Sequence, residues 1–387
     1  MPSPQVPLIA ALLALAAIPI NVVMWWLMFT GKSSEAGMYV ALFCLIALGQ
    51  LICGLVALIS GIRYRVKVGT GGVGSAVVGG LTTVGALTGW LAGMASLALG
   101  AGGAWGRPLR VRGRQLHPEL KAGSDWTRGD RPSPAGLDEP TRAALEGLWL
   151  HDAQKEHASV PAFARVSWML AAAGAPAELL EWSHRAALEE IEHTRLCFAL
   201  AAGYAGRSHS VEAMPDLLVG GLDVKGNALE VLAIESLGDG CQLEDFNADV
   251  AAACAAACEE PVTKQVLETI AREERTHAGF SWAVVEWLLS RDAGVVGAAL
   301  RKTLATLDAY PRPTAVGRDK LALVAKASPQ ALLKHGRLPD ERWAELWSMR
   351  LQKTRDRLWV ALQAHGADAT PVYGGLTQVG SPTQTRA

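Results

Sequence analysis

The feature of this sequence that most restricts its fold is a seven-residue pattern, Ala-x-Glu-Glu-x-x-His, that occurs twice. The copies occupy 187–193 and 271–277, each within a long stretch of helical composition. Residues three apart on a helix share a face, so the second Glu and the His of each copy can point at one centre. These residues are Glu190, His193, Glu274 and His277. A carboxylate and an imidazole on one face form half of a transition-metal site, and the repeat predicts two such halves.

Two further glutamates extend the repeat. Glu156 lies in the helical stretch before that of Glu190, and Glu235 lies in the stretch before that of Glu274, at a similar separation in the sequence. The sequence can therefore be divided into two similar halves, each a helix with one Glu followed by a helix with Glu-x-x-His. In a bundle of four helices, this arrangement builds a carboxylate-bridged site for two metal ions.

Four long helical patterns carry these residues, at about 140–172, 177–204, 228–258 and 261–290. All six candidate ligands fall on the apolar stripes of their helices. An unpaired charge buried there would cost several kcal/mol, which favours a metal site. A bundle that keeps the pattern without metal is the alternative. One long connection, 205–227, joins two closely linked helix pairs, as a crossover along a bundle requires.

Acidic residues beside the candidate ligands have weaker assignments. Glu189 and Glu273 precede ligands in the sequence and turn about 100° away from the ligand face, so we expect them to face solvent. Asp152 and Asp239 each lie one turn from a candidate ligand Glu and could accept a hydrogen bond from a ligand His. An exposed aspartate on a helix is the alternative for both.

The first hundred residues differ in character from the rest. Residues 1–31 and 68–106 contain no charged side chain. Apolar runs at about 7–30, 38–62 and 75–98 are long enough to cross roughly 30 Å of hydrocarbon. They predict a transmembrane region over 1–106 with three spans, or four if the third run is a pair of short ones. Seven basic residues at 107–131 favour a cytoplasmic location for the domain that follows.

The expected fold class is all-α, with N-terminal transmembrane helices followed by a four-helix bundle and extra C-terminal helices. The segments are a basic linker with little structure at 107–140, the bundle at 141–290, a helical extension at 291–366 with a clear helix near 339–364, and a disordered tail at 367–387. Six cysteines fit no disulfide framework. The net charge of −1 gives no indication of nucleic acid as a partner.

At the candidate ligands the chain resembles the ferritin-like superfamily, in particular its rubrerythrin-like and di-iron oxidase or oxygenase branches. The stretch Glu156-His-Ala-Ser-Val-Pro-Ala-Phe-Ala-Arg165 also resembles uncharacterised bacterial ferritin-like domain proteins. The resemblance covers about 142–290 and implies a ferritin-like four-helix bundle with two irons, for which manganese can substitute. The absence of a Cys-x-x-Cys pair from this sequence argues against a full rubrerythrin.

The resemblance also implies a role for each ligand. Glu190 and Glu274 would bridge the two irons. Glu156 with His193 would complete one iron, and Glu235 with His277 the other. Glu230 lies near Glu235 in a loosely matching stretch, so the ligand on the third helix remains open between the two.

Six protein ligands around two metals leave coordination positions for O₂ or peroxide. The first functional expectation is therefore a di-iron oxidoreductase, an oxidase or oxygenase in the inner (cytoplasmic) membrane that needs an electron donor. A second is an iron-handling or peroxide-detoxifying protein for which iron itself is the substrate. A third is a membrane scaffold with a degenerate bundle. Three spans on each chain disfavour a ferritin-like shell, whereas a smaller homo-oligomer remains open.

Overall fold

A computed structural model describes residues 106–111, 114–214, 217–218, 226–309 and 312–368, together with Ile59. The chain divides into two units, Met1–Gly100 and Ala101–Ala387, and every described residue except Ile59 belongs to the second. Apart from Ile59, the three expected spans lie outside the described residues, as does nearly all of the expected tail. Within the described residues, no helix is both long and apolar enough to cross a membrane.

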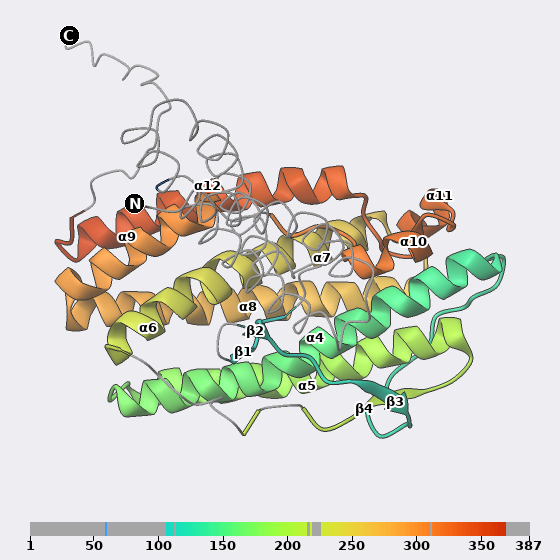
Figure 1. The fold of residues 1–387 in the computed structure, drawn as a ribbon, viewed down its shortest axis with the longest axis horizontal. Coiled ribbons are helices and arrows are strands. Elements are labelled where there is room, and N and C mark those ends of the chain that lie inside the picture. The colour runs from blue at the N-terminus through green and yellow to red at the C-terminus, as the bar shows by residue number, and fades with distance from the viewer. Residues whose placement is uncertain are drawn as a thin grey trace, which may run out of the picture. The chain divides into compact units, whose positions relative to one another are not determined.

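The described unit is mostly helical, as the sequence predicts (Figure 1). Its long helices are α4 (Glu139–Ala172), α5 (Ala177–Ala205), α6 (Ala228–Glu235) with α7 (Asp245–Ala257), and α8 (Pro261–Arg291). A π-helix, η2 (Ser236–Glu244), joins α6 to α7. The C-terminal part contains α9 (Ala293–Ala309), the 3-10 helix η3 (Arg318–Lys320), α10 (Leu321–Val324), α11 (Pro329–Lys334) and α12 (Asp340–Ala364). The bounds expected for α4, α5 and α8 are each correct to one residue.

Local sequence signals explain where the long helices begin and end. The side chain of Asp138 accepts a hydrogen bond from the backbone N–H of Thr141 and caps α4, and Glu260 caps α8 in the same way through Thr263. Both helices have Pro in their first turn, where a missing N–H leaves no bond unmade. α5 ends at Gly206, whose φ of 70° is the left-handed conformation that favours glycine. Short turns after α4 and α7 then produce two helix hairpins.

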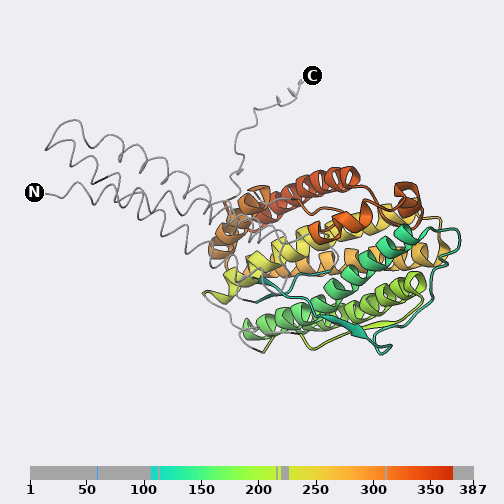
Figure 2. The same cartoon turned by 45° about the vertical axis from the view of Figure 1, so that its right-hand side comes forward.

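The two hairpins lie side by side (Figures 1 and 2). α4 packs along α5, and η2 and α7 pack along α8. α5 also meets α8, and α4 meets α6, so the four helical segments enclose a common interior. The C-terminal helices α9 and α12 contact α6, η2 and α7, and they cover the second hairpin but not the first.

The interior consists of two apolar clusters with a polar layer between them. One cluster contains Trp149, Phe198, Phe246 and Ile270. The other contains Phe163, Leu170, Leu232 and Phe280. Along α4, α5 and α8, the residues of one cluster precede the candidate ligands and those of the other follow them. The polar layer is therefore sealed from both ends of the bundle by apolar side chains.

The stretch 107–140, expected to be a linker with little structure, is built into the fold. β1 (Arg110–Val111) pairs antiparallel with β2 (Arg114–Gln115), and β3 (Leu120–Ala122) pairs antiparallel with β4 (His209–Val211). Leu109, Val111 and Leu116 are buried against Ala158 and Ala162 of α4. The prediction was wrong because it weighed the Pro, Gly and Arg content and not the apolar residues between them.

Candidate metal centre

Five of the six predicted ligands meet in the polar layer. Two groups of side chains each offer ligand atoms that lie within 4.8 Å of one another. The first group is Glu156, Glu190, His193 and Glu274; the second is Glu190, Glu244, Glu274 and His277. All six residues are fully buried. Glu190 and Glu274 belong to both groups, which is the geometry that a bridging carboxylate requires.

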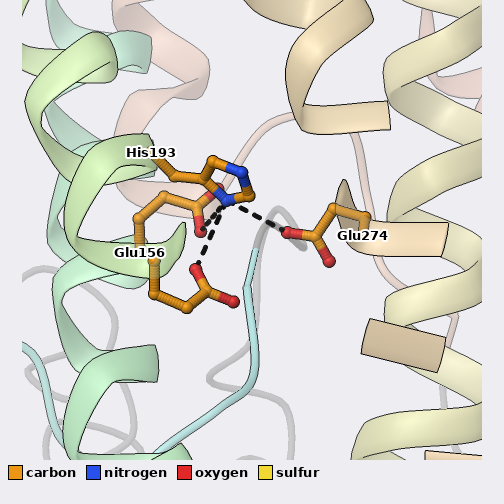
Figure 3. A group of neighbouring side chains, drawn as sticks. Glu156, His193 and Glu274 are labelled. Carbon is orange, nitrogen blue, oxygen red and sulfur yellow. Dashed lines mark ion pairs between the residues drawn. The ribbon is translucent and has the colours of Figure 1, made fainter. Parts of the chain in front are cut away.

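Both imidazole rings direct Nδ1 into the centre. His193 Nδ1 lies 3.5 Å from Glu190 Oε2, 3.7 Å from Glu274 Oε1 and 3.8 Å from Glu156 Oε2; Figure 3 shows Glu156, His193 and Glu274 converging. His277 Nδ1 lies 3.3 Å from Glu190 Oε1. Two atoms that bind one ion at about 2.1 Å, at right angles, are about 3 Å apart. The spacing of these atoms is therefore close to that of a filled metal site.

The other nitrogen of each ring is held from outside the centre. His193 Nε2–H donates to Glu273 Oε2 at 2.9 Å, and His277 Nε2–H donates to Glu189 Oε2 at 2.8 Å. Because a carboxylate can only accept, Nε2 carries a proton in both rings, which leaves the Nδ1 lone pair for a metal. In each copy of the repeated pattern, the second Glu enters the centre and the first Glu orients the His of the other copy.

The prediction that Glu189 and Glu273 face solvent was wrong. Their side chains are only 26% and 23% exposed. A turn of about 100° from the ligand face points each carboxylate towards the neighbouring helix of the pair α5 and α8, which contact each other.

Hydrogen bonding inside the centre is incomplete. Within the described part of the chain, no partner donates to either oxygen of Glu156, Glu190, Glu244 or Glu274, and Nδ1 of both histidines is likewise unpaired. Buried polar atoms are nearly always hydrogen-bonded in native proteins, and buried charges are paired or bind metal. Four carboxylates and two imidazoles whose ligand atoms have no protein partner fit a metal site.

In the metal-free centre, protons bound to the carboxyl and imidazole groups supply part of the positive charge that a metal ion would supply. Burial raises the pKa of Glu156 far above its usual range, and the nearby Glu190 adds to the effect. Burial would also raise the pKa of Glu190, but the two flanking imidazoles lower it well below its usual range. Burial lowers the pKa of His277, but Glu189 and Glu190 overcome it and raise the pKa to about 9. The pKa of His193 is raised well above its usual value for the same reason, through its own carboxylate neighbours. A metal ion must therefore displace protons from both rings.

Glu235, the predicted ligand on the third helix, lies outside both groups. Its side chain forms an ion pair with Arg165 of α4, which lies well beyond Glu156 on that helix, by roughly 13 Å along the axis. Glu244, the last residue of the π-helix, enters the centre in its place. The i→i+5 bonding of a π-helix adds about one residue to each turn. Glu235 was selected for its sequence separation from Glu274, and such a separation does not show which residue of a partly π-helical segment faces the centre.

The sequence contained a signal for Glu244 in the distances from the helix turns. Glu190 follows the start of α5 at Ala177 by the same interval at which Glu274 follows the start of α8 at Pro261. Residues at similar distances from a tight turn face each other in a helix hairpin. Glu244 precedes the end of α7 at Ala257 by that same interval, whereas Glu235 lies much further from this end. Counting from the turn favours Glu244.

The remaining acidic candidates have other partners. Asp152 accepts a hydrogen bond from Arg337 at 2.6 Å, and Asp239 forms an ion pair with Arg110. Neither one holds a ligand His. The sequence left open whether each aspartate holds a ligand His or is exposed; in the structure, each one pairs with an arginine.

Comparisons with protein-family models, with curated proteins and with solved structures gave no match to this chain. The geometry alone defines a mostly helical protein with a buried group of four carboxylates and two imidazoles. This group can hold a metal ion.

Proposed function

We propose that this protein is a membrane-anchored, ferritin-like di-iron carboxylate protein that reacts with O₂ or peroxide. One observation carries the proposal: two groups of buried ligand atoms share Glu190 and Glu274. One ion in each group, bridged by these carboxylates, accounts for the overlap. The proposed ligand set keeps Glu156, Glu190, His193, Glu274 and His277, and it replaces Glu235 with Glu244.

The charge of the ligands supports two divalent ions. Four ionised carboxylates balance two divalent ions. The histidines would bind as neutral rings, with Nε2–H donating a hydrogen bond to Glu189 or Glu273 and Nδ1 free for the metal. A mixture of carboxylate and imidazole ligands suits iron, with manganese as a possible substitute. A neutral core is what burial in an apolar interior demands.

The surrounding residues determine what the centre can do. Bound irons would supply electrons and open coordination positions for O₂ or peroxide. The chain itself excludes bulk water, since the ligands are buried between two apolar clusters. The Phe163 ring lies edge-on to His277, with centroids 5.1 Å apart, and restricts the movement of that ring. Glu189 and Glu273 keep both imidazoles in the metal-binding tautomer.

The membrane anchor in this proposal rests on the sequence. The uncharged runs within 1–106 are long enough to span a bilayer, and the basic residues at 107–131 favour a cytoplasmic bundle. A membrane-soluble substrate such as a quinone or a lipid would explain why an oxidase is anchored. A reporter fused after Ala387 should be active on the cytoplasmic side; activity on the opposite side would contradict this orientation.

Metal analysis of the full chain, followed by O₂ uptake, tests the function. Purified protein should hold about two irons per chain. Its reduced form should consume O₂ repeatedly with an external electron donor and keep both irons. The matched control is the double variant Glu190→Ala, Glu274→Ala, which should hold no iron and consume no O₂.

Two results would point elsewhere. Oxidation of many Fe(II) per chain, with release of the product, would make iron the substrate and the protein an iron-handling one. A chain that binds no iron or manganese after reconstitution would be a degenerate bundle, and its function would lie in the membrane region.

A further inference from the structure

We propose that Gly106 and Arg107 form one wall of the metal centre and position its two non-bridging carboxylates, Glu156 and Glu244. The inference rests on the proposed metal site. Gly106 is the last residue of the uncharged stretch 68–106, Arg107 directly follows it, and both precede β1. They lie far from the ligands in the sequence and belong to none of the four bundle helices, so no spacing rule would have selected them.

Gly106 lies directly against the carboxylate of Glu156. A Cβ at position 106 would be 2.8 Å from Glu156 Oε2 and 2.2 Å from Ser159 Oγ. Ser159 in turn donates a hydrogen bond to the backbone carbonyl of Arg107 at 3.0 Å, which holds the segment on α4. The φ of Gly106 is 70°, a conformation that also favours glycine. The backbone itself therefore limits how far the Glu156 carboxylate can move.

Arg107 joins two of the three helical segments that provide the second group of ligands. Its side chain donates to the carbonyl oxygen of Glu235 at 3.1 Å and to Ser281 Oγ at 3.4 Å. Glu235 is the residue at which α6 gives way to the π-helix, and Ser281 lies one turn beyond His277 on α8. Ser281 Oγ also donates to the His277 carbonyl at 3.1 Å. The guanidinium thus fixes the start of η2 against the helix that carries Glu274 and His277.

The space that Arg107 occupies depends on a second glycine. A Cβ at Gly240, inside η2, would be 3.1 Å from Arg107 Nη1 and 2.4 Å from Ser281 Cβ. The π-helix can pass this close to α8, with a guanidinium beside it, only because residue 240 has no side chain. Arg107 is 2% exposed, and its carbon Cζ lies 5.4 Å from the centroid of the Phe163 ring. It therefore also contacts the ring that packs on His277.

These contacts place the two residues between the two groups of ligands. Gly106 bears on Glu156, which belongs to the first group alone. Arg107 holds one end of the nine-residue π-helix whose other end is Glu244, which belongs to the second group alone. The segment thus positions Glu156 and Glu244, the carboxylates that each belong to one group alone. The two shared carboxylates come from α5 and α8.

The first test compares two glycines with the same backbone conformation. Gly206 also has a φ of 70°, but a Cβ there would meet no atom within 4 Å. Gly106→Ala and Gly206→Ala therefore share the backbone strain and differ in the contact with Glu156. Full-chain protein is titrated with Co(II), whose visible absorption reports the ligand geometry. Gly106→Ala should bind one Co(II) at least about tenfold more weakly and shift the spectrum, and Gly206→Ala should match the unmodified chain.

The second test removes the two contacts of Arg107. Arg107→Met should weaken the Co(II) held with Glu244 by about tenfold or more. Arg107→Lys keeps the charge but cannot span both acceptors, so it should recover part of the loss. The control is Arg312→Met, which removes an arginine ion pair with Asp340, neither of which is a ligand. If Arg107→Met does not fold, Arg107→Lys and Gly106→Ala decide the question.

The outcomes separate this inference from the proposed function. If the unmodified chain binds two Co(II) and the Gly106 and Arg107 variants match it in affinity and spectrum, the inference is overturned and the metal site stands. If the unmodified chain binds no Co(II), iron or manganese, the metal site is overturned and the inference with it. Weakened Co(II) binding in both variants, with both controls unchanged, supports the proposal that Gly106 and Arg107 position Glu156 and Glu244.

Discussion

The two helix hairpins bring nearly the same ligands to the centre on different helices. In each, the second helix carries Glu-Glu-x-x-His at the same distance from its start. The first helices differ: α4 is α-helical over 34 residues, whereas the third helix is a π-helix over nine of its residues. Glu156 and Glu244 nevertheless occupy corresponding places. Equivalent ligand positions can therefore be reached by helices of different geometry.

The hairpins also differ in what supports them from outside. The first is covered by the short strands, by Gly106 and by the short C-terminal helices η3, α10 and α11, which contact α4. The second is covered by α9 and α12, and Arg350 of α12 bonds Asp245, the residue after Glu244, at 3.0 Å. Arg275, the residue after Glu274, pairs with the same aspartate. The C-terminal extension thus supports the hairpin with the irregular helix, where a loss of register would displace a ligand.

The largest effect is expected for the carboxylates that the two halves share. Glu190→Ala or Glu274→Ala should abolish binding of both ions, because each belongs to both groups. Glu156→Ala should remove only one, since Glu156 belongs to the first group alone. Metal content per chain after reconstitution measures this. Retention of one ion by Glu190→Ala would show that the halves bind independently and that the bridge does not exist.

The next effect tests the π-helix. Glu244→Ala should lose one of two ions, whereas Glu235→Ala should keep both, because Glu235 pairs with Arg165 away from the centre. The two variants remove the same side chain from the same helical segment, so each controls for the other. The opposite result would mean that the third helix is a regular α-helix and that the two hairpins are alike.

The regular helices were predicted from the sequence, whereas the ligand on the irregular third helix was not. Helical periodicity predicted α4, α5 and α8, and the i, i+3 rule placed Glu190 with His193 and Glu274 with His277. Glu235 was predicted from its sequence separation from Glu274, which does not register the irregular geometry of the third helix. Expectations for residues 1–105 remain predictions.

Contacts between different helices and strands could not be predicted from the sequence for a different reason. Glu189 was assigned to solvent because its helix neighbours were known and the helix opposite was not. Gly106 and Arg107 reach the centre through contacts with residues far away in the sequence, such as Ser159 and Ser281. No local pattern encodes such distances, and only the folded chain brings these residues together.

A smaller effect concerns pH. His277 has a pKa of about 9 in the metal-free centre, against 6.5 for a free histidine, so a metal must displace its proton at neutral pH. The apparent affinity of the second group should rise with pH from pH 7, by about tenfold per pH unit for the His277 proton alone. Burial and the nearby Glu244 also raise the pKa of Glu274 well above its usual range, which adds to the rise. The His277 proton also stabilises the metal-free fold: its contribution is complete below pH 6.5 and is lost as the pH rises through about 9.

Competitive titrations of Co(II) between pH 6 and 10, with thermal unfolding of the metal-free chain, would measure both trends. Affinity should rise with pH while the stability of the metal-free chain falls. Profiles that stay flat above pH 7 would indicate that His277 binds its proton no more tightly than a free imidazole. Glu156→Ala, which leaves the second group of ligands complete, allows the pH profile of that group to be measured by itself.

The smallest effect tests the crossed support between the halves. Glu189 lies on α5 but holds His277 of α8, and Glu273 lies on α8 but holds His193 of α5. Glu189→Gln should therefore weaken the ion of the second group, and Glu273→Gln that of the first. The loss should be about tenfold, at the low end for groups that orient a ligand, since the amide oxygen can still accept from Nε2–H. Spectra of the singly loaded Glu156→Ala and Glu244→Ala chains would identify which ion is affected. If each Gln substitution instead weakened the ion bound by the His of its own helix, the two halves would be self-contained, and the repeated first Glu would have no role in joining them.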